Sequence, residues 1–294
     1  MANAFSKVKQ IDLCPACGDS RHFFFTNKNN FDIWQCENCG MRRVYPLPES
    51  IDVYSENYFG GGDDGFGYVD YDANKEAMRD VLIKYLDIIK QHTNGRRLLD
   101  VGGATGYFAN LARQYGFDAQ GIELSKEAVA MGREKGYPIE EGVLSRIDLN
   151  AGSLDVITLL DVLEHLPDPN GDISKVREIL VPGGIMILNF PDHGSVFARV
   201  LGKRWHQYVP PEHLNFFHNK SITLFLEKHG FEILLSTRIG KRFPLSYIMR
   251  IGSGWLKFAP LTYLANKINS YPKVSSVSIP LDLRDNLFVV ARKK

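Results

Sequence analysis

One stretch of the sequence decides the fold: residues 98–107, which read Leu98-Leu99-Asp100-Val101-Gly102-Gly103-Ala104-Thr105-Gly106-Tyr107. The apolar run 97–101 predicts a strand, and residues 107–115 predict a helix that Gly116 ends. Glycine between a strand and a helix lets the backbone turn sharply and approach a ligand closely. The stretch therefore predicts a ligand-binding glycine loop.

Strands and helices alternate outward from this loop. We expect further strands at 118–124, 139–144, 154–160, 185–190, 231–237 and 287–291, and helices at 74–92, 126–135, 173–180 and 221–229. Ser125 is a plausible helix cap, and residues 182–184 form a turn. Alternation of this kind predicts an α/β fold, with a parallel sheet covered by helices on both faces.

The acidic residues around the loop indicate the kind of ligand. Glu123 ends the next strand, 23 positions after Asp100, where a carboxylate can bind both hydroxyls of a ribose. A dinucleotide fold requires glycine at the first, third and sixth loop positions, but here the third and sixth are Ala104 and Tyr107. An acid at position 100 suits the ammonium of an amino-acid-bearing ligand better than a pyrophosphate.

These motifs resemble the class I S-adenosylmethionine-dependent methyltransferases, together with Leu159-Leu160-Asp161-Val162-Leu163-Glu164-His165-Leu166, Pro182-Gly183-Gly184 and Phe288-Val289-Val290-Ala291. The resemblance covers residues 94–294. It implies an enzyme with a Rossmann-like seven-stranded sheet whose last strand is antiparallel. It implies a cofactor site formed by Asp100, Gly102, Gly103, Ala104, Thr105, Gly106, Tyr107, Glu123, Leu124, Leu144 and Asp161. Ala104 departs from the usual glycine, and Val143 and Leu144 stand where an acid normally reads the adenine.

The four cysteines predict a zinc ribbon over residues 10–45. Two Cys-x2-Cys pairs, Cys14/Cys17 and Cys36/Cys39, are separated by residues 18–35, which is typical zinc spacing. Four sulfur ligands make a closed, structural Zn²⁺ site, with ribbon strands at 22–25 and 31–35. Two disulfides are the alternative, but the first ten residues lack the apolar run of a secretory signal. A docking or substrate-lid module is the expected role.

Composition favours a soluble globular protein, with 44% hydrophobic and 23% charged residues and a net charge of +1. We expect a cytoplasmic location, with contact at the inner face of the membrane as an option. Residues 1–50 hold six Lys or Arg against five Asp or Glu, so nucleic acid is not an expected partner.

Residues 46–93 are expected to be a linker, a tyrosine-rich loop and a lid helix. A helical, basic and aromatic insert is expected at about 240–280. Residues 233–281 contain no acid, and the cations there are Arg238, Lys241, Arg242, Arg250, Lys257, Lys267 and Lys273. Such a segment suits an anionic acceptor, or peripheral contact with a membrane or a lipid-linked substrate through residues 238–273. A solvated helical insert is the alternative.

Catalysis is assigned to His165, His213 and Glu164. Methyl transfer to a hydroxyl needs a base, most often His, in the loops after the fourth and fifth strands. Asp161, Glu164, His165 and His213 also resemble the set that binds a divalent ion in ubiquinone-pathway and small-RNA O-methyltransferases. His193, His206 and His218 are expected at the surface or on a pocket wall.

A narrower resemblance suggests the acceptor. The ribbon, the tyrosine-rich loop, residues 161–165 and residues 205–217 resemble methyltransferases of bacterial glycan and cell-surface biosynthesis. The expected reaction is therefore O-methylation of a sugar hydroxyl in a glycan or in a nucleotide- or lipid-linked precursor. The alternatives are an RNA (tRNA) methyltransferase, a small-molecule quinone-type O-methyltransferase, and a non-catalytic scaffold that keeps the cofactor fold.

Overall fold

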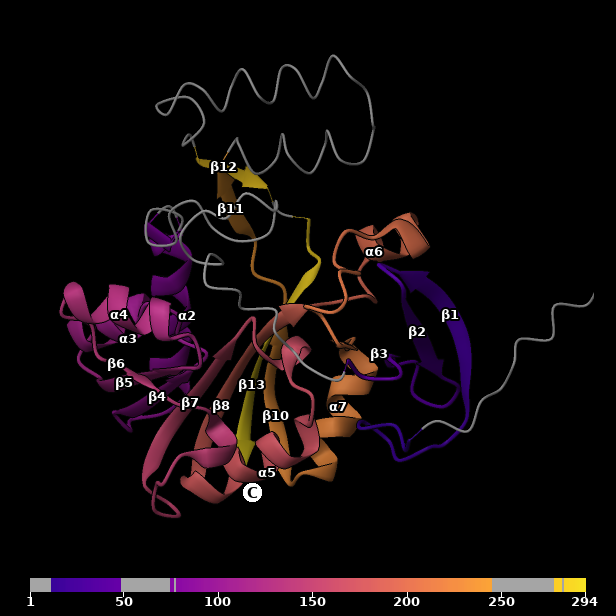
Figure 1. The fold of residues 1–294 in the computed structure, drawn as a ribbon. Helices are drawn as coiled ribbons and strands as arrows, with labels where there is room; N and C mark the ends of the chain where they lie inside the picture. The colour runs from indigo at the N-terminus through magenta and orange to yellow at the C-terminus, as the bar shows by residue number, and fades with distance from the viewer. Residues whose placement is uncertain (1–11, 49–74, 77, 245–277, 282) are drawn as a thin grey trace, which may run out of the picture.

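A seven-stranded sheet lies at the centre of the molecule (Figure 1). The computed structural model describes residues 12–48, 75–76, 78–244, 278–281 and 283–294. The strand order is β10-β13-β8-β7-β4-β5-β6. Strands β4 to β8 of this sheet pair in parallel, whereas β13 runs antiparallel to both β8 and β10. The predicted Rossmann-like methyltransferase sheet, with its antiparallel last strand, is confirmed.

The strands of this sheet are β4 (Arg97–Val101), β5 (Asp118–Glu123), β6 (Ile139–Glu141), β7 (Leu154–Leu160), β8 (Leu180–Pro191), β10 (Phe231–Thr237) and β13 (Asn286–Lys293). The α-helices are α2 (Arg79–His92), α3 (Tyr107–Gln114), α4 (Lys126–Glu134), α5 (Pro169–Ile179), α6 (Val196–Leu201) and α7 (Asn219–Lys228). Short 3-10 turns are η1 (Leu144–Arg146), η2 (Leu163–His165) and η3 (Gly202–Arg204).

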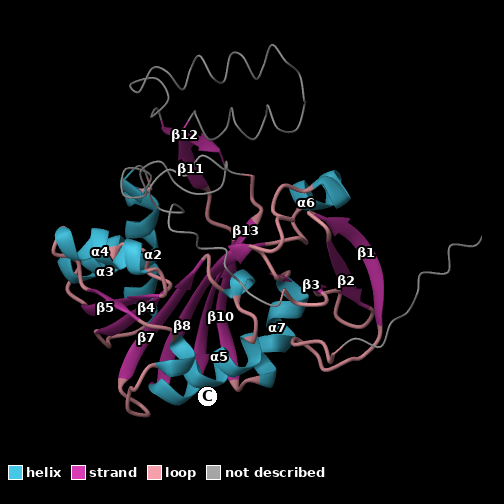
Figure 2. Cartoon of the chain, viewed as in Figure 1, coloured by secondary structure: helices cyan, strands magenta, loops and turns pink. Residues whose placement is uncertain are grey.

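Two apolar layers cover the sheet, because successive strand residues point to opposite faces. Leu99, Ile157 and Leu188 pack with α5 and α7, while Leu98 and Ile187 pack with α2 and α3. Figure 2 shows helices on both sides of the strands. This layering leaves the carboxyl ends of β4, β5 and β7 and their loops at one edge of the sheet, where ligands bind in open α/β sheets.

Helix α5 begins earlier than the sequence pattern predicted. The expected start was Ile173, but the helix begins at Pro169 because the Asp168 side chain accepts a hydrogen bond from the Gly171 amide. Proline is well placed in the first turn of a helix, where its missing N–H is not needed. The predicted 182–184 turn lies within β8, where Gly183 has a φ of 76°.

The cysteine segment forms a second, smaller sheet in the order β1-β2-β3-β9. Its strands are β1 (His22–Lys28), β2 (Phe31–Cys36), β3 (Arg42–Val44) and β9 (Asn215–Phe216). Strand β9 lies between β8 and β10 in the sequence, so the ribbon strands continue into the larger part of the protein. Cys14, Cys36 and Cys39 also share an apolar cluster with Phe217 and Ile222. The two sheets are therefore joined by backbone pairing and by a common core.

The tyrosine-rich loop and most of the basic insert lie outside the described residues. The two ends of the expected helical insert are strands, β11 (Lys241–Pro244) and β12 (Ser278–Leu281), which pair antiparallel (Figure 1). The expected helix is therefore wrong at these ends. In the described part of the chain, no helix is both long and apolar enough to span a membrane.

Candidate functional site

The glycine loop runs from the end of β4 to the start of α3 and requires unusual backbone angles. Gly102 has a φ of 67°, and a Cβ there would lie 2.6 Å from Val162 Cγ2. Gly106 caps α3 with a φ of 84°. Ala104 also lies in the left-handed region, at a φ of 49°, which costs roughly 1–2 kcal/mol for a residue with a Cβ. Glycine would take this conformation without that cost.

Glu123 locks the loop to the next strand. Its two carboxylate oxygens accept hydrogen bonds from the amides of Ala104 and Ser125, each at 3.0 Å. The side chain is buried, and Ser125 also caps α4 as the sequence predicted. A carboxylate at this strand end is placed to bind ribose hydroxyls, and its bond to the Ala104 amide sets the shape of the loop.

Asp100 is a buried acid beneath the loop. Its Oδ1 accepts a 2.6 Å hydrogen bond from the Thr158 hydroxyl, while Oδ2 faces Gly103. Burial raises the pKa of Asp100 to about 7, although the Thr158 bond and the charge of Lys75 lower it. Such a carboxylate gains from a cationic ligand group, so the site fits the ammonium of S-adenosylmethionine.

Asp161 ends β7 in a strained conformation, with a φ of 59°. The Asn189 side chain donates a 2.6 Å hydrogen bond to its Oδ1, and the Asp161 amide donates to the Asn189 carbonyl at 2.7 Å. Tyr85 of α2 donates to the Asn189 side-chain oxygen at 3.4 Å, which fixes the amide orientation. Asp161 is thus held rigidly at the sheet edge, between the predicted cofactor and catalytic residues.

His165 and His213 form the centre of the predicted catalytic set. Their ring centroids lie 4.8 Å apart, with the planes at 81°. Together with Glu164, each offers one ligand atom, and these atoms all lie within 4.8 Å of one another. Glu164 and His213 are buried, and His165 is half-buried. The structure brings the three predicted residues together although His213 is 48 positions from His165 in the sequence.

Backbone carbonyls fix the tautomers of both rings. His165 Nδ1 lies 2.7 Å from the Glu212 carbonyl, and His213 Nδ1 lies 2.9 Å from that of Gln207. A carbonyl can only accept, so each Nδ1 carries the proton and each Nε2 keeps its lone pair. Burial lowers the pKa of His165, and burial followed by the neighbouring His165 lowers the pKa of His213 to about 3. Both rings are neutral at pH 7, as a base or a metal ligand must be.

The remaining predicted cofactor residues occupy different environments. Leu144 begins η1 and is buried, as is Thr105. The Tyr107 hydroxyl donates to the Glu76 carboxylate, which ties the start of α3 to the segment before α2. Leu124 is 55% exposed, so its side chain lies at the surface beside the loop.

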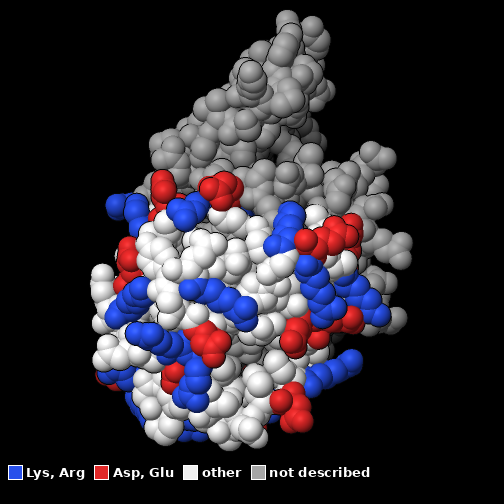
Figure 3. Space-filling model, turned by 90° about the vertical axis from the view of Figure 1, so that its left-hand side faces the viewer, with Lys and Arg blue, Asp and Glu red and all other residues white. Residues whose placement is uncertain are grey.

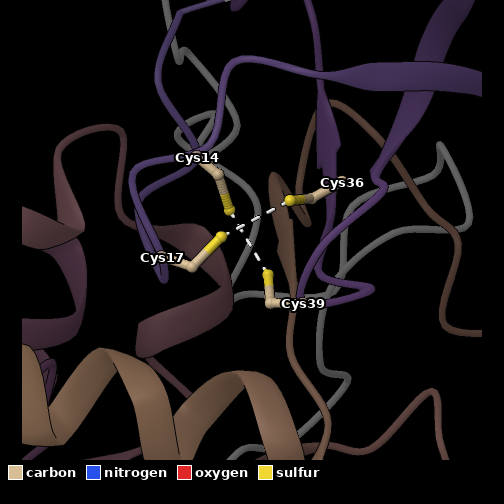
Figure 4. Close-up of side chains that lie close together, drawn as sticks. All are labelled: Cys14, Cys17, Cys36 and Cys39. Carbon is tan, nitrogen blue, oxygen red and sulfur yellow. Dashed lines mark hydrogen bonds between the residues drawn. The ribbon is translucent and has the colours of Figure 1, made fainter.

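The four cysteine sulfurs converge on one point (Figure 4). Sγ atoms lie 3.5 Å apart in the pairs Cys14–Cys39 and Cys17–Cys36, and all four thiols are free. Sulfurs bound to zinc at 2.3 Å in a tetrahedron lie about 3.8 Å apart, so this set fits Zn²⁺. The Cys39 thiol lowers the pKa of Cys14 to about 4, while burial raises the pKa of Cys36 to about 11. The packed thiols cannot easily ionise together without a cation.

Two of the three weaker histidine candidates differ from expectation. His193 is 6% exposed and packs against His218, with ring centroids 4.6 Å apart. His218 in turn lies against Gly40 of the cysteine segment, where a Cβ would meet its ring at 3.3 Å. Both residues therefore belong to the junction between the two sheets. His206 lies near Asp285, with 3.8 Å between Nε2 and Oδ2.

Several residues at the site were not singled out from the sequence. Asn189 and Thr158 are polar residues in mostly apolar strands, which is a usable signal. Arg43 and Asn215 contact the turn that carries Glu164 and His165 through tertiary pairing, and no local pattern marks them.

A family comparison agrees with this geometry. A model described as a methyltransferase domain matches residues 71–236, which is more than half of the chain. The chain belongs to the class I S-adenosylmethionine-dependent methyltransferases. The prediction of an enzyme that uses this cofactor is therefore confirmed, and the glycine loop described above is that of a methyltransferase.

Curated relatives of this methyltransferase are O-methyltransferases. The ubiquinone biosynthesis O-methyltransferase of Nitrosococcus oceani is 28% identical over 199 residues, covering 62% of this chain and 84% of that protein. The protein of the same name from Bordetella avium is 30% identical over 115 residues, covering 37% of this chain and 48% of its own length. The methyltransferase thus spans about half the length of the Bordetella relative.

Solved structures share the fold. The magnesium protoporphyrin IX methyltransferase of Synechocystis is 14% identical with a TM-score of 0.53, covering 83% of this chain and all of that one. A methyltransferase from Archaeoglobus fulgidus has a TM-score of 0.51 at 15% identity, covering 74% of this chain and 94% of its own. At such identities the likeness concerns the fold alone.

Proposed function

We propose that this methyltransferase transfers a methyl group to a phenolic hydroxyl of a quinol-type small molecule. The observation that carries the proposal is the Glu164–His165–His213 cluster beside the cofactor loop. The name of the relatives, ubiquinone biosynthesis O-methyltransferase, supports a quinone-type acceptor over the sugar hydroxyl expected first. A phenol has a pKa of about 10, far below that of an alcohol, so it needs less activation.

The buried imidazoles suit this task in different ways. A base must take the hydroxyl proton at neutral pH, and a ring with a pKa of about 3 is a weak base. His213 is therefore better suited to coordinate a cation or orient the acceptor, and His165 is the better candidate for accepting a proton at Nε2. When bound, S-adenosylmethionine supplies the electrophilic methyl group. Asp100 would hold its ammonium group and Glu123 its ribose, so that the acceptor oxygen could be aligned with the methyl carbon.

The same three side chains fit a divalent ion. One carboxylate and two neutral imidazoles are donors that Zn²⁺ and related cations accept, and each ring has its Nε2 lone pair available. An ion held there would lower the pKa of a hydroxyl bound to it. Glu164, His165 and His213 would be its ligands, and Asp161, on the same turn, adds negative charge close to both rings.

An acceptor screen tests the proposal. Purified protein is incubated with labelled S-adenosylmethionine and catechol, a polyprenylated catechol, a nucleotide-linked sugar or tRNA. We expect product with the catechols and none with the sugar or the RNA. Product with the sugar alone would restore the glycan hypothesis. A mild chelator that leaves the cysteine site loaded should reduce turnover, and added Mg²⁺ or Zn²⁺ should restore it.

We infer that the cysteine ribbon holds one structural Zn²⁺. The sulfur geometry supports this, and a four-sulfur site leaves no open position for substrate. Elemental analysis should find one zinc per chain, and Cys36→Ser should lose it. Oxidised cysteines without zinc would contradict the inference.

We propose that the basic segment 238–273 binds an anionic surface or an anionic part of the acceptor. Its charge supports this, although residues 245–277 lie outside the described part. Elsewhere, on the face that carries α3 and α4, both signs of charge are interspersed (Figure 3). Co-sedimentation with vesicles of anionic and of neutral lipids, at two salt concentrations, tests the proposal.

A further inference from the structure

We propose that the cysteine ribbon is part of the catalytic framework, and that Arg43 is a positioning residue for the turn that carries Glu164 and His165. The proposal rests on the proposed function in that it takes these residues as the acceptor site. It replaces the expectation of a separate docking or lid module with a mechanical role inside the enzyme.

A continuous hydrogen-bond ladder leads from the ribbon to the catalytic turn. The Val44 amide of β3 donates to the Leu214 carbonyl at 2.9 Å, and the Leu214 amide donates to the Glu164 carbonyl at 2.8 Å. Leu214 directly follows His213 in the chain. The segment behind His213 is therefore fixed on one side by the ribbon and on the other by the residue before His165.

Two side chains add hydrogen bonds to the same turn, and together with the ladder they are called the clamp. Arg43 Nη2 donates to the Pro167 carbonyl at 2.6 Å, and Asn215 Nδ2 donates to the neighbouring Leu166 carbonyl at 2.6 Å. Arg43 and Asn215 are themselves paired across β3 and β9. The carbonyls of residues 164, 166 and 167 are thus all bound by Leu214, Asn215 or the ribbon, which leaves little freedom to the turn around His165.

Charge and apolar packing support the same connection. Burial lowers the pKa of Arg43, and Asp12, Asp168 and Cys14 oppose that shift, so the guanidinium lies in the negative field of both the ribbon and the cap of α5. Val44 also packs in one cluster with Leu214. Unfolding of the ribbon would both expose this apolar surface and break the hydrogen-bond ladder.

The cofactor loop is held by other groups. The hydrogen bonds to Asp100 and Glu123 come from Thr158, Ala104 and Ser125, all outside the ribbon. Damage to the clamp should therefore lower kcat and raise the acceptor KM while the affinity for S-adenosylmethionine stays constant. A general loss of structure would lower kcat, raise the acceptor KM and also weaken the affinity for S-adenosylmethionine.

The test compares Arg43→Gln with Arg21→Gln in the full-length protein. Arg21 lies in the same ribbon, has a 65% exposed side chain and pairs with Asp19 of its own segment. Arg21→Gln therefore removes the same charge as Arg43→Gln at a site that does not contact the turn. Hydrogen–deuterium exchange is measured on peptides covering 160–170 and 208–218. We expect faster exchange in both peptides for Arg43→Gln alone, with zinc content and cofactor affinity unchanged.

Activity on the accepted phenol adds a second measurement. We expect kcat to fall about 10- to 100-fold in Arg43→Gln, because small misplacements of catalytic groups have effects of this size. Arg43→Lys keeps the charge but loses the planar fork, so it should show smaller changes of the same sign and remains a test if the glutamine variant does not fold. Cys36→Ser should accelerate exchange in the same two peptides.

The outcomes separate this proposal from the proposed function. Unchanged exchange in both peptides for Arg43→Gln and Cys36→Ser would overturn the positioning role, whatever the acceptor is. Faster exchange without methylation of any phenol would support the positioning role and reject the phenolic acceptor.

Discussion

At the cofactor loop, Asp100, Ala104 and Glu123 lie within 23 positions of one another, and the Ala104 amide donates to the Glu123 carboxylate at the end of the next strand. Asp100 has a more distant partner, Thr158 of β7. Around His213, the contacts join residues 42–44, 163–167 and 205–217. The first region is formed mostly by neighbouring segments of the chain, whereas the second exists only when three distant segments assemble. We therefore expect cofactor binding to tolerate damage that abolishes methyl transfer.

The largest expected effect is on kcat, and it should follow from substitutions in the region around His213 rather than at the cofactor loop. His165→Ala should lower kcat by about 10²- to 10⁴-fold, the usual contribution of a general base, while cofactor affinity barely changes. His213→Ala should also lower kcat, because a cation ligand or an acceptor contact is lost. If proton removal is the lost function, the residual rate should increase with pH. Steady-state kinetics and calorimetry measure both quantities, and His92→Ala, at the end of α2, is the matched control. Near-normal kcat in both variants would place the acceptor elsewhere.

Glu123→Ala should have the opposite profile. Loss of its buried hydrogen bonds should weaken S-adenosylmethionine binding by about 1–3 kcal/mol and leave kcat at saturating cofactor nearly unchanged. Glu141→Ala is the control, since Glu141 lies opposite Glu123 on β6 but is exposed. Equal affinities in the two variants, measured by calorimetry, would show that the ribose is bound elsewhere.

The buried Asp100 carboxyl group should make the stability of the ligand-free protein depend on pH. The pKa of Asp100 is raised from 3.8 to about 7 in the folded protein. Between these two pH values the folded protein therefore keeps a proton on Asp100 that the unfolded chain has lost. The stabilisation is present below about pH 4 and is lost as the pH rises to about 7. Thermal unfolding of the ligand-free protein between pH 4 and 8 should therefore show a smaller decline in Asp100→Asn than in the wild type. Parallel curves would contradict this.

The smallest expected effect is at the cap of α4. Ser125→Ala should reduce the free energy of unfolding by about 1 kcal/mol, because the Ala128 amide loses its acceptor. Ser20→Ala, in an exposed loop of the ribbon, should have no measurable effect. Denaturant titration measures both, and kcat should stay constant because α4 belongs to the cofactor half.

The same contrast explains what could be predicted from the sequence. Strands β4, β7 and β10 begin and end where their apolar runs do, and Ser125 caps α4 as its local pattern indicates. The start of α5 was misplaced because the cap at Asp168 decides it rather than the apolar period. The candidate catalytic residues could be named from the sequence but not the contacts around them, because Arg43 and Asn215 reach them through pairing between distant segments.

The connection between β10 and β13, which contains the paired strands β11 and β12, bears on how the protein can vary in evolution. Strands β10 and β13 are adjacent antiparallel partners, so the intervening chain, residues 238–285, is in topological terms a hairpin connection. Doubling the length of such a connection adds only about 0.6 kcal/mol of closure entropy. The sheet therefore sets few limits on the length or sequence of this connection, which could vary during evolution while the cofactor loop stayed constant.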